Sequence, residues 1–277
     1  MLGIVIITAL ISTVATYIDK HLINKGISRK DYFYYMCLSM IPFSIIMIVV
    51  DCFRGEIKIE LNIISIALLL VAMFLRYKKQ HTIVGCLRHL NPYESVTYMT
   101  LGIILAFIID TLIGAKNFEV KTIISIVVTL VGVFMLADTK LKIKSLQKDL
   151  IIRIICEVGL GYVAHYMLKY WTNSIYILIL NLMLTLIFSK GYNIKYHKKN
   201  KNIIKWVFLQ QLFGFFTVYL GNYISSTSVM IYQYIRPVTI VMTIMVAFII
   251  KNIDRKPKIK DLISVILVAL GVYLLNQ

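Results

Sequence analysis

The sequence predicts an all-α membrane protein with ten transmembrane helices, arranged as two inverted five-helix repeats. Three observations lead to this prediction: the composition is very apolar, apolar segments of spanning length follow one another, and basic residues alternate between the loops. Of the 277 residues, 59% are hydrophobic and 16% are charged, and the mean hydropathy is +0.81. These values lie outside the range of ordinary globular domains, so a soluble fold is excluded first.

Ten apolar segments, bounded by polar or charged clusters, divide the chain. A spanning helix needs roughly 20 mostly apolar residues, so ten helices with short loops use nearly the whole chain. No separate soluble domain is expected. The predicted spans are residues 2–23, 31–51, 61–86, 93–113, 120–138, 149–168, 173–189, 203–223, 227–250 and 259–276.

Two of these segments need separate justification. The first begins at Leu2 with no basic region before it and no evident cleavage site, so it is interpreted as a spanning helix and not as a removed signal peptide. The third is interrupted by a basic group, residues 76–81, which is discussed below.

The distribution of Lys and Arg between the loops supports the span count. Of these residues, 23 fall in the odd-numbered loops and 5 in the even-numbered loops; 20 against 5 remain when the basic group of the third segment is left out. Because basic residues concentrate in cytoplasmic loops, the odd-numbered loops are expected to face the cytoplasm and both termini the outside of the cell membrane. The net charge of +17 then reflects topology and contact with anionic lipid, and nucleic acid is not an expected partner.

An internal repeat is visible in the sequence. Residues 122–136 align without gaps on residues 261–275, and each stretch is the last helix of its half. We therefore predict repeats over residues 1–140 and 148–277, with opposite orientations because each has an odd number of helices. Identical pairs include Ile124/Ile263, Ser125/Ser264, Gly132/Gly271, Val133/Val272 and Leu136/Leu275.

Two short stretches carry a resemblance to a known family. These are residues 221–238, a polar turn followed by a segment containing Pro237, and the closing residues 271–275, which begin with Gly271. In these features the chain resembles the drug/metabolite transporter superfamily, in its EamA-like ten-helix form. The resemblance implies two five-helix repeats and secondary transport.

Two charged residues in the predicted spans are the first site candidates. Arg236 lies about 15 Å into the ninth span and Glu157 about 12 Å into the sixth from the opposite face, at roughly 1.5 Å per residue. Both are expected near the midplane, where an ionised side chain costs roughly 2.5–3.5 kcal/mol. They either line a transport cavity or form an ion pair that only holds helices together. Arg153, one turn before Glu157, is expected to extend toward the cytoplasmic interface.

The basic group of the third segment allows two interpretations. Its residues are either loop charges or, since a span ending near Leu75 would be too short, part of a longer helix that lines the cavity. In the second case Arg76 and Lys79 share a helix face. Among the aromatic and amide side chains of the second half, the predicted substrate-binding residues are Tyr162, Tyr232, Gln233 and Gln210.

Motifs of common enzymes are missing. The chain has no phosphate-binding glycine loop, no HExxH, no GxSxG and no paired CxxC, so we expect neither an enzyme nor a cofactor or metal site. The four cysteines lie without paired spacing in or beside apolar segments, and no disulfide is predicted.

The sequence therefore favours a secondary transporter for a small anionic or zwitterionic metabolite, working by alternating access around a midplane site. The expected partners are that small molecule and membrane lipid, and the oligomeric state is left open. A flippase for a lipid-linked phosphate and a membrane assembly subunit without transport activity are the alternatives.

Overall fold

The described residues of the computed structural model, 2–114, 119–136, 144–189, 201–233, 235–249 and 258–275, form helices and one isolated antiparallel bridge between Ile59 and Trp171. Residues 140–143 of the predicted boundary between the halves, which covers residues 140–148, and several predicted loop lysines lie outside these ranges. The helices are α1 (Leu2–Asn24), α2 (Arg29–Phe53), α3 (Ile63–His89), α4 (Pro92–Met99), α5 (Leu101–Leu112), α6 (Val120–Leu136), α7 (Lys144–Met167), α8 (Asn173–Phe188), α10 (Lys201–Thr227), α11 (Val229–Gln233), α12 (Ile235–Ile249) and α13 (Ile259–Leu275).

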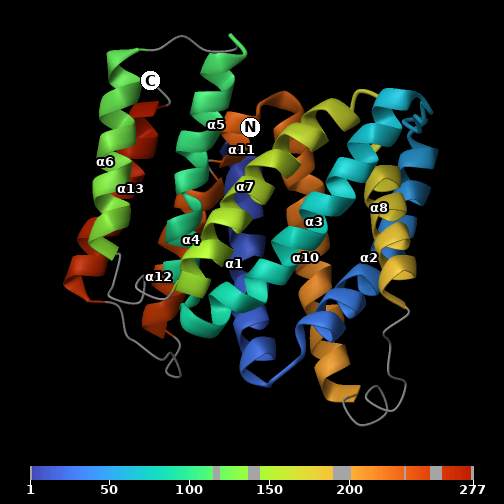
Figure 1. Cartoon of the computed structure of the whole chain (residues 1–277), viewed down its shortest axis with the longest axis horizontal. Helices are drawn as coiled ribbons and strands as arrows, with labels where there is room; N and C mark the ends of the chain where they lie inside the picture. The colour runs from blue at the N-terminus through green and yellow to red at the C-terminus, as the bar shows by residue number, and fades with distance from the viewer. Residues whose placement is uncertain are drawn as a thin grey trace.

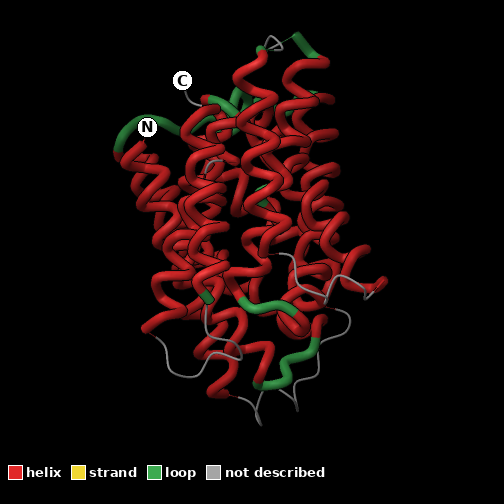
Figure 2. The backbone as a smooth tube through the Cα atoms, turned by 90° about the vertical axis from the view of Figure 1, so that its left-hand side faces the viewer, coloured by secondary structure: helices red, strands yellow, loops and turns green. Residues whose placement is uncertain are grey.

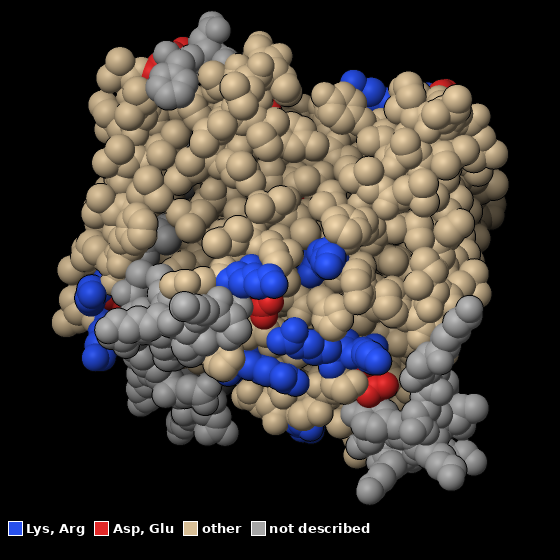
Figure 3. Space-filling view, in the orientation of Figure 1, with Lys and Arg blue, Asp and Glu red and all other residues tan. Residues whose placement is uncertain are grey.

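The helices have the length and surface of a helical membrane protein. Within the described residues, five helical segments are long and apolar enough to cross a membrane, and three shorter apolar helices accompany them. Large apolar side chains point outward, as in the 86% exposed Ile63 and the 70% exposed Leu186. In Figure 3 a broad band without charged residues crosses the molecule below a few charged residues at the top edge, while most of the visible Lys and Arg gather in the lower half. Such an uncovered apolar belt suits a lipid environment.

Each of the main helix contacts joins a helix from before residue 137 to one from after residue 143. Helix α3 packs on α7, α1 on α10, α2 on α8, and α6 on α13. Several helices run roughly parallel, whereas α3 and α7 cross them at a slant (Figures 1 and 2). The two parts of the chain are therefore interleaved in one bundle, and any site between them draws residues from both.

The contact between α6 and α13 is reciprocal. A Cβ atom on Gly132 would come within 2.8 Å of the Ser264 carbonyl oxygen, and one on Gly271 within 2.9 Å of the Ser125 carbonyl oxygen. The Ser125 hydroxyl also donates to the carbonyl of Gly271. The two glycines allow the helix backbones to approach closely. Gly132 faces Ser264 and Gly271 faces Ser125, and these two serines occupy equivalent positions in the sequence repeat.

Helix α3 settles the structure of the basic group. It begins with a capping box between Asn62 and Ser65 and continues without interruption to His89. All of residues 76–81 are helical, so their interpretation as a loop is wrong. Arg76 is buried, whereas Lys78 points outward with its Nζ 5.6 Å from the centroid of the Phe74 ring. The charges interrupt the apolar sequence without ending the helix, because some of them face a polar interior.

One end of the bundle, called the basic end below, collects the C-termini of α1 and α3 and the N-termini of α2, α7 and α10. Lys20 of α1 donates to the carbonyls of Leu87 and Leu90 at the end of α3. Arg29 of α2 forms an ion pair with Asp149 of α7 at 3.7 Å. Exposed Lys25, Lys30, Arg88, Lys148 and Lys205 also belong to this end.

Candidate functional site

Glu157 of α7 is the centre of a charged cluster inside the bundle. Its side chain is 2% exposed, and its Oε2 lies 2.5 Å from Lys79 Nζ of α3. Its Oε1 forms an ion pair with Arg236 of α12 and accepts a hydrogen bond from the Tyr232 hydroxyl at 2.7 Å. The carboxylate is therefore shared between two cations from different helices and a tyrosine.

Local packing brings these side chains together. Gly159 lies against Leu75, and a Cβ there would come within 2.9 Å of Leu75 Cδ1, so a larger residue would require the Leu75 side chain to shift. Arg236 lies in the first turn of α12, beside Pro237. A proline is tolerated there, because the first N–H groups of a helix have no partner within the helix.

A chamber of about 100 Å³ extends from the cluster toward the basic end. It is formed by parts of α1, α2, α3, α7, α10, α11 and α12, and most of its lining residues lie in the halves of these helices nearer the basic end. Four cationic and two acidic side chains line it: Arg76, Lys79, Arg153, Arg236, Asp19 and Glu157. If all are ionised, the cations exceed the carboxylates by two.

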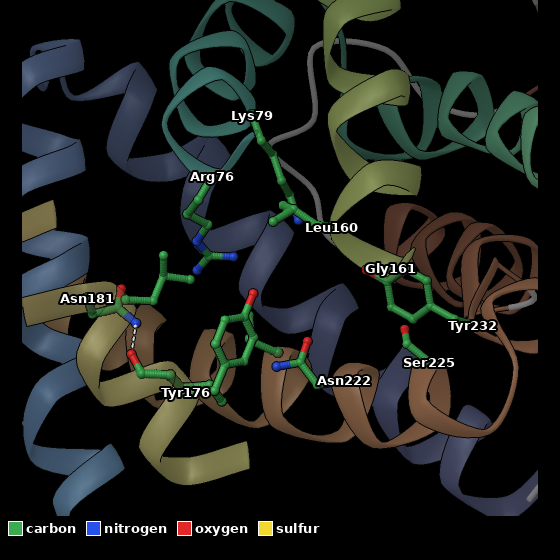
Figure 4. Close-up of a pocket in the computed structure, with 12 residues that line it drawn as sticks. Arg76, Lys79, Leu160, Gly161, Tyr176, Asn181, Asn222, Ser225 and Tyr232 are labelled. Atoms are coloured by element: carbon green, nitrogen blue, oxygen red, sulfur yellow. Dashed lines mark hydrogen bonds between the residues drawn. The ribbon is translucent and has the colours of Figure 1, made fainter. Parts of the chain in front are cut away.

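A smaller cavity of about 30 Å³ lies on the other side of the cluster. Figure 4 shows Arg76 and Lys79 extending from α3 into this region, with Tyr232, Tyr176 and Asn222 around them. Arg76, Lys79, Val218 and Tyr232 line both the cavity and the chamber. One layer of side chains thus separates a space near the basic end from a space nearer the opposite end.

Two arginines of the chamber have weak or incomplete hydrogen bonding. Arg76 is 5% exposed, and its guanidinium donates to the Met40 sulfur at 3.5 Å, a weak acceptor. Arg153 donates to the Ser95 hydroxyl at 2.6 Å, while its Nε has no hydrogen-bond partner. The expectation that Arg153 extends to the interface is wrong, because the side chain is 7% exposed and held inward by Ser95 of α4.

Two of the predicted binding residues do not join the cluster. Tyr162 is five residues beyond Glu157, which rotates it about 140° around the helix, and its hydroxyl donates to Asp110 at 2.5 Å. Gln233 is fully buried and lines neither space; its amide faces Gly102, and its two polar atoms have no hydrogen-bond partner. Gln210 does line the chamber, where its side-chain oxygen accepts from Gln211.

Sequence reasoning missed part of the chamber. Asp19, which lies near the end of α1 and is not among the predicted site residues, is 9% exposed and accepts a hydrogen bond from the Tyr32 hydroxyl. Arg153 could have been placed, since it lies one turn from Glu157 and therefore on the same face. Asn181 and Asn222, which line the smaller cavity, lie in apolar segments and give no comparable signal.

The arrangement is suited to binding a negatively charged group. Moving charges out of water is costly, and the cost is recovered only when each charge finds a partner. Lys79 and Arg236 share one carboxylate, and the described hydrogen bonds of Arg76 and Arg153 go to a sulfur and a hydroxyl. An anion in the chamber would supply the missing partners through charge-assisted hydrogen bonds.

Within the described residues, no three His, Cys, Asp or Glu side chains gather as a metal site would require. The four cysteines, Cys37, Cys52, Cys86 and Cys156, are free. No protein-family model and no curated protein sequence matches the chain.

Proposed function

We propose that the protein is a multi-pass secondary transporter of the cell membrane, which moves a small anionic or zwitterionic metabolite by alternating access. The single observation that carries the proposal is the Glu157 cluster, in which one buried carboxylate is shared by Lys79 and Arg236 between two spaces on opposite sides. A charged cluster that served only to hold helices together would have no need of a cavity on either side.

The proposed architecture is ten spans in two inverted repeats. The helix contacts support it, because nearly every contact between two spans has a counterpart between the equivalent spans of the other repeat. In this comparison α1, α2, α3 and α6 are equivalent to α7, α8, α10 and α13. The contact of α3 with α7 corresponds to that of α10 with α1, and the contact of α10 with α2 to that of α3 with α8. The reciprocal glycine contacts between α6 and α13 follow the same exchange. Two-fold symmetry of this kind lets one fold open to either side by exchanging the conformations of its halves.

The proposed binding step is an exchange of partners. An anionic group entering from the basic end would meet Arg153 early, since Arg153 lies one turn nearer that end of α7 than Glu157 and has no carboxylate in the described bonds. It would then compete with Glu157 for Lys79 and Arg236. Protonation of Glu157 would free both cations for the substrate, which makes proton coupling a natural consequence of the geometry.

The alternatives gain less support. An assembly subunit without transport would be favoured by an ion pair closed off from any cavity, whereas Glu157 and Arg236 both line the chamber. We propose no catalytic activity, since the sequence has no HExxH, no GxSxG, no phosphate-binding glycine loop and no paired CxxC. Neither alternative explains two unequal spaces around one charged layer.

A ligand screen followed by transport tests the proposal. Purified protein would be screened by thermal shift against sugar phosphates, nucleotide sugars, amino acids and organic cations. Bound ligand at 100 times its Kd stabilises the folded state by about 2.7 kcal/mol. Anionic or zwitterionic compounds are expected to stabilise the protein, and the best of them should enter liposomes that contain it.

Arg236→Ala is the decisive variant, with Arg88→Ala as control because Arg88 is exposed at the basic end and lies outside the chamber. Arg236→Ala should remain in the membrane and lose both the thermal shift and uptake, whereas Arg88→Ala should retain them. Normal uptake by Arg236→Ala, or stabilisation by organic cations alone, would contradict the proposed function.

A further inference from the structure

A second binding site is suggested by a cavity at the basic end that is separate from the chamber. It lies between α2, α3 and α8 and has a volume of about 210 Å³, which exceeds that of the chamber. It shares no lining residue with the chamber, so it requires an explanation of its own. Its lining residues are Arg29, Lys30, Asp31, Phe33, Tyr34, Tyr77, His81, Ile187 and Phe188.

The inner wall of this cavity is aromatic. The rings of Tyr77 and Phe188 stack with centroids 4.9 Å apart and an interplanar angle of 18°. Phe33 meets Phe188 edge-on at 4.6 Å, and the His81 ring lies 5.1 Å from Tyr77. Three aromatic rings from three different helices thus form a firm apolar surface beneath the opening.

The rim of the cavity is cationic. Arg29 and Lys30 begin α2 and line the cavity directly. The acidic residue beside them, Asp31, is engaged in capping α2, since its carboxylate accepts from the Ser28 hydroxyl at 2.5 Å. Among the described residues, Arg29 forms an ion pair with Asp149 at a distance of 3.7 Å, and its side chain is 37% exposed. The rim therefore carries two positive groups, Arg29 and Lys30, beside one carboxylate, Asp31, which keeps its negative charge.

The position of the cavity joins two kinds of surface. On α3, Leu70, Phe74, Tyr77 and His81 follow one another on one face, and Leu70 and Phe74 are each 60% exposed. Ile187, which lines the cavity on α8, is 54% exposed. The apolar wall is thus continuous with the surface that suits lipid chains, while the rim belongs to the basic end.

We infer that this cavity binds an anionic phospholipid, with the phosphate at Arg29 and Lys30 and the glycerol and upper acyl chains over Tyr77 and Phe188. A free phosphate could use the rim alone, but it would leave the aromatic wall uncovered. A neutral lipid could use the wall alone, and the two cations would gain nothing. Basic sites between helices at the cytoplasmic side are typical binding places for acidic head groups.

Lipid titration with native mass spectrometry tests this inference on the whole protein in detergent. Phosphatidylglycerol should bind more tightly than phosphatidylcholine with the same acyl chains. The double variant R29Q/K30Q should weaken phosphatidylglycerol binding by about tenfold or more, since each cation near an acidic head group contributes severalfold in affinity. The matched control is K25Q/R88Q, which removes two exposed cations of the same end outside the cavity.

Three results would overturn the inference. These are equal weakening of lipid binding in the control variant, equal binding of the two lipids, or binding of inorganic phosphate as tight as that of phosphatidylglycerol. Because Arg29→Gln also removes the partner of Asp149, Lys30→Gln alone serves if the double variant does not fold. Phe188→Leu, which keeps both cations, should weaken binding of the lipid and leave that of inorganic phosphate unchanged. Transport is not used as a readout, so this test stands apart from the proposed function.

Discussion

Replacing Glu157 by glutamine should destabilise the protein strongly, because two buried cations would lose their shared partner. The side chains of Lys79 and Arg236 are 14% and 12% exposed, so water can solvate them only in part. Two unit charges about 4 Å apart interact by about 4 kcal/mol at an effective dielectric constant of about 20. Removing one partner of a buried pair costs about 3–5 kcal/mol in measured cases. The two estimates agree, and we expect Glu157→Gln to cost about 3–5 kcal/mol.

The assay is unfolding by SDS in mixed micelles, followed by the fluorescence of Trp171 and Trp206. Glu56→Gln is the control, since Glu56 is an exposed residue in the connection between α2 and α3. Its cost should stay within about 0.5 kcal/mol, as for most surface substitutions. Both variants make the same chemical change, so the difference between them reports the cluster alone.

A double variant distinguishes loss of charge balance from loss of packing. If the cost of Glu157→Gln comes from uncompensated cations, adding Lys79→Met should recover part of it, because one buried charge is removed with its hydration cost. The two substitutions should therefore deviate from additivity by more than about 1 kcal/mol. A cost for Glu157→Gln equal to that of Glu56→Gln, or strict additivity in the double variant, would refute the reasoning.

Two further predictions follow from packing and exposure. Gly271→Ala should reduce the free energy of unfolding by about 1–3 kcal/mol through overpacking, since its Cβ would meet Thr129 and come within 2.9 Å of the Ser125 carbonyl oxygen. The control Gly3→Ala, whose Cβ would have no atom within 4 Å, should be neutral or slightly stabilising in the same unfolding assay. Cys52 is the exposed cysteine of the four and lies in the last turn of α2, away from the basic end. If the basic end faces the cytoplasm, a membrane-impermeant maleimide should label Cys52 in intact cells. Labelling only after the cells are broken would contradict that orientation.

The sequence determined the helical segments well, because lipid-spanning helices are specified by local composition. Each predicted apolar segment contains helical residues, with ends that differ by about five residues or fewer within the described ranges. The third segment was ambiguous for a physical reason: Arg76 and Lys79 lower its hydropathy, yet they face an interior that only other helices create. Composition within one segment carries no information about its neighbours.

The cluster around Glu157 could be anticipated only in part. The pairing of Glu157 with Arg236 agrees with their similar predicted depth, which residue counting provides. The part played by Lys79 depends on the close approach of α3 and α7, and that of Arg153 on a serine in α4. Tyr162 shows the converse, since its depth suited a binding residue and its helix face did not.

The sequence by itself determined where helices form and which charges lie far from water, because both follow from the cost of placing each residue in an apolar medium. Only the tertiary structure decided which way those charges point, which of them share a partner, and where space remains between the helices. These properties depend on rotation and packing between segments far apart in the chain, and no single segment records them.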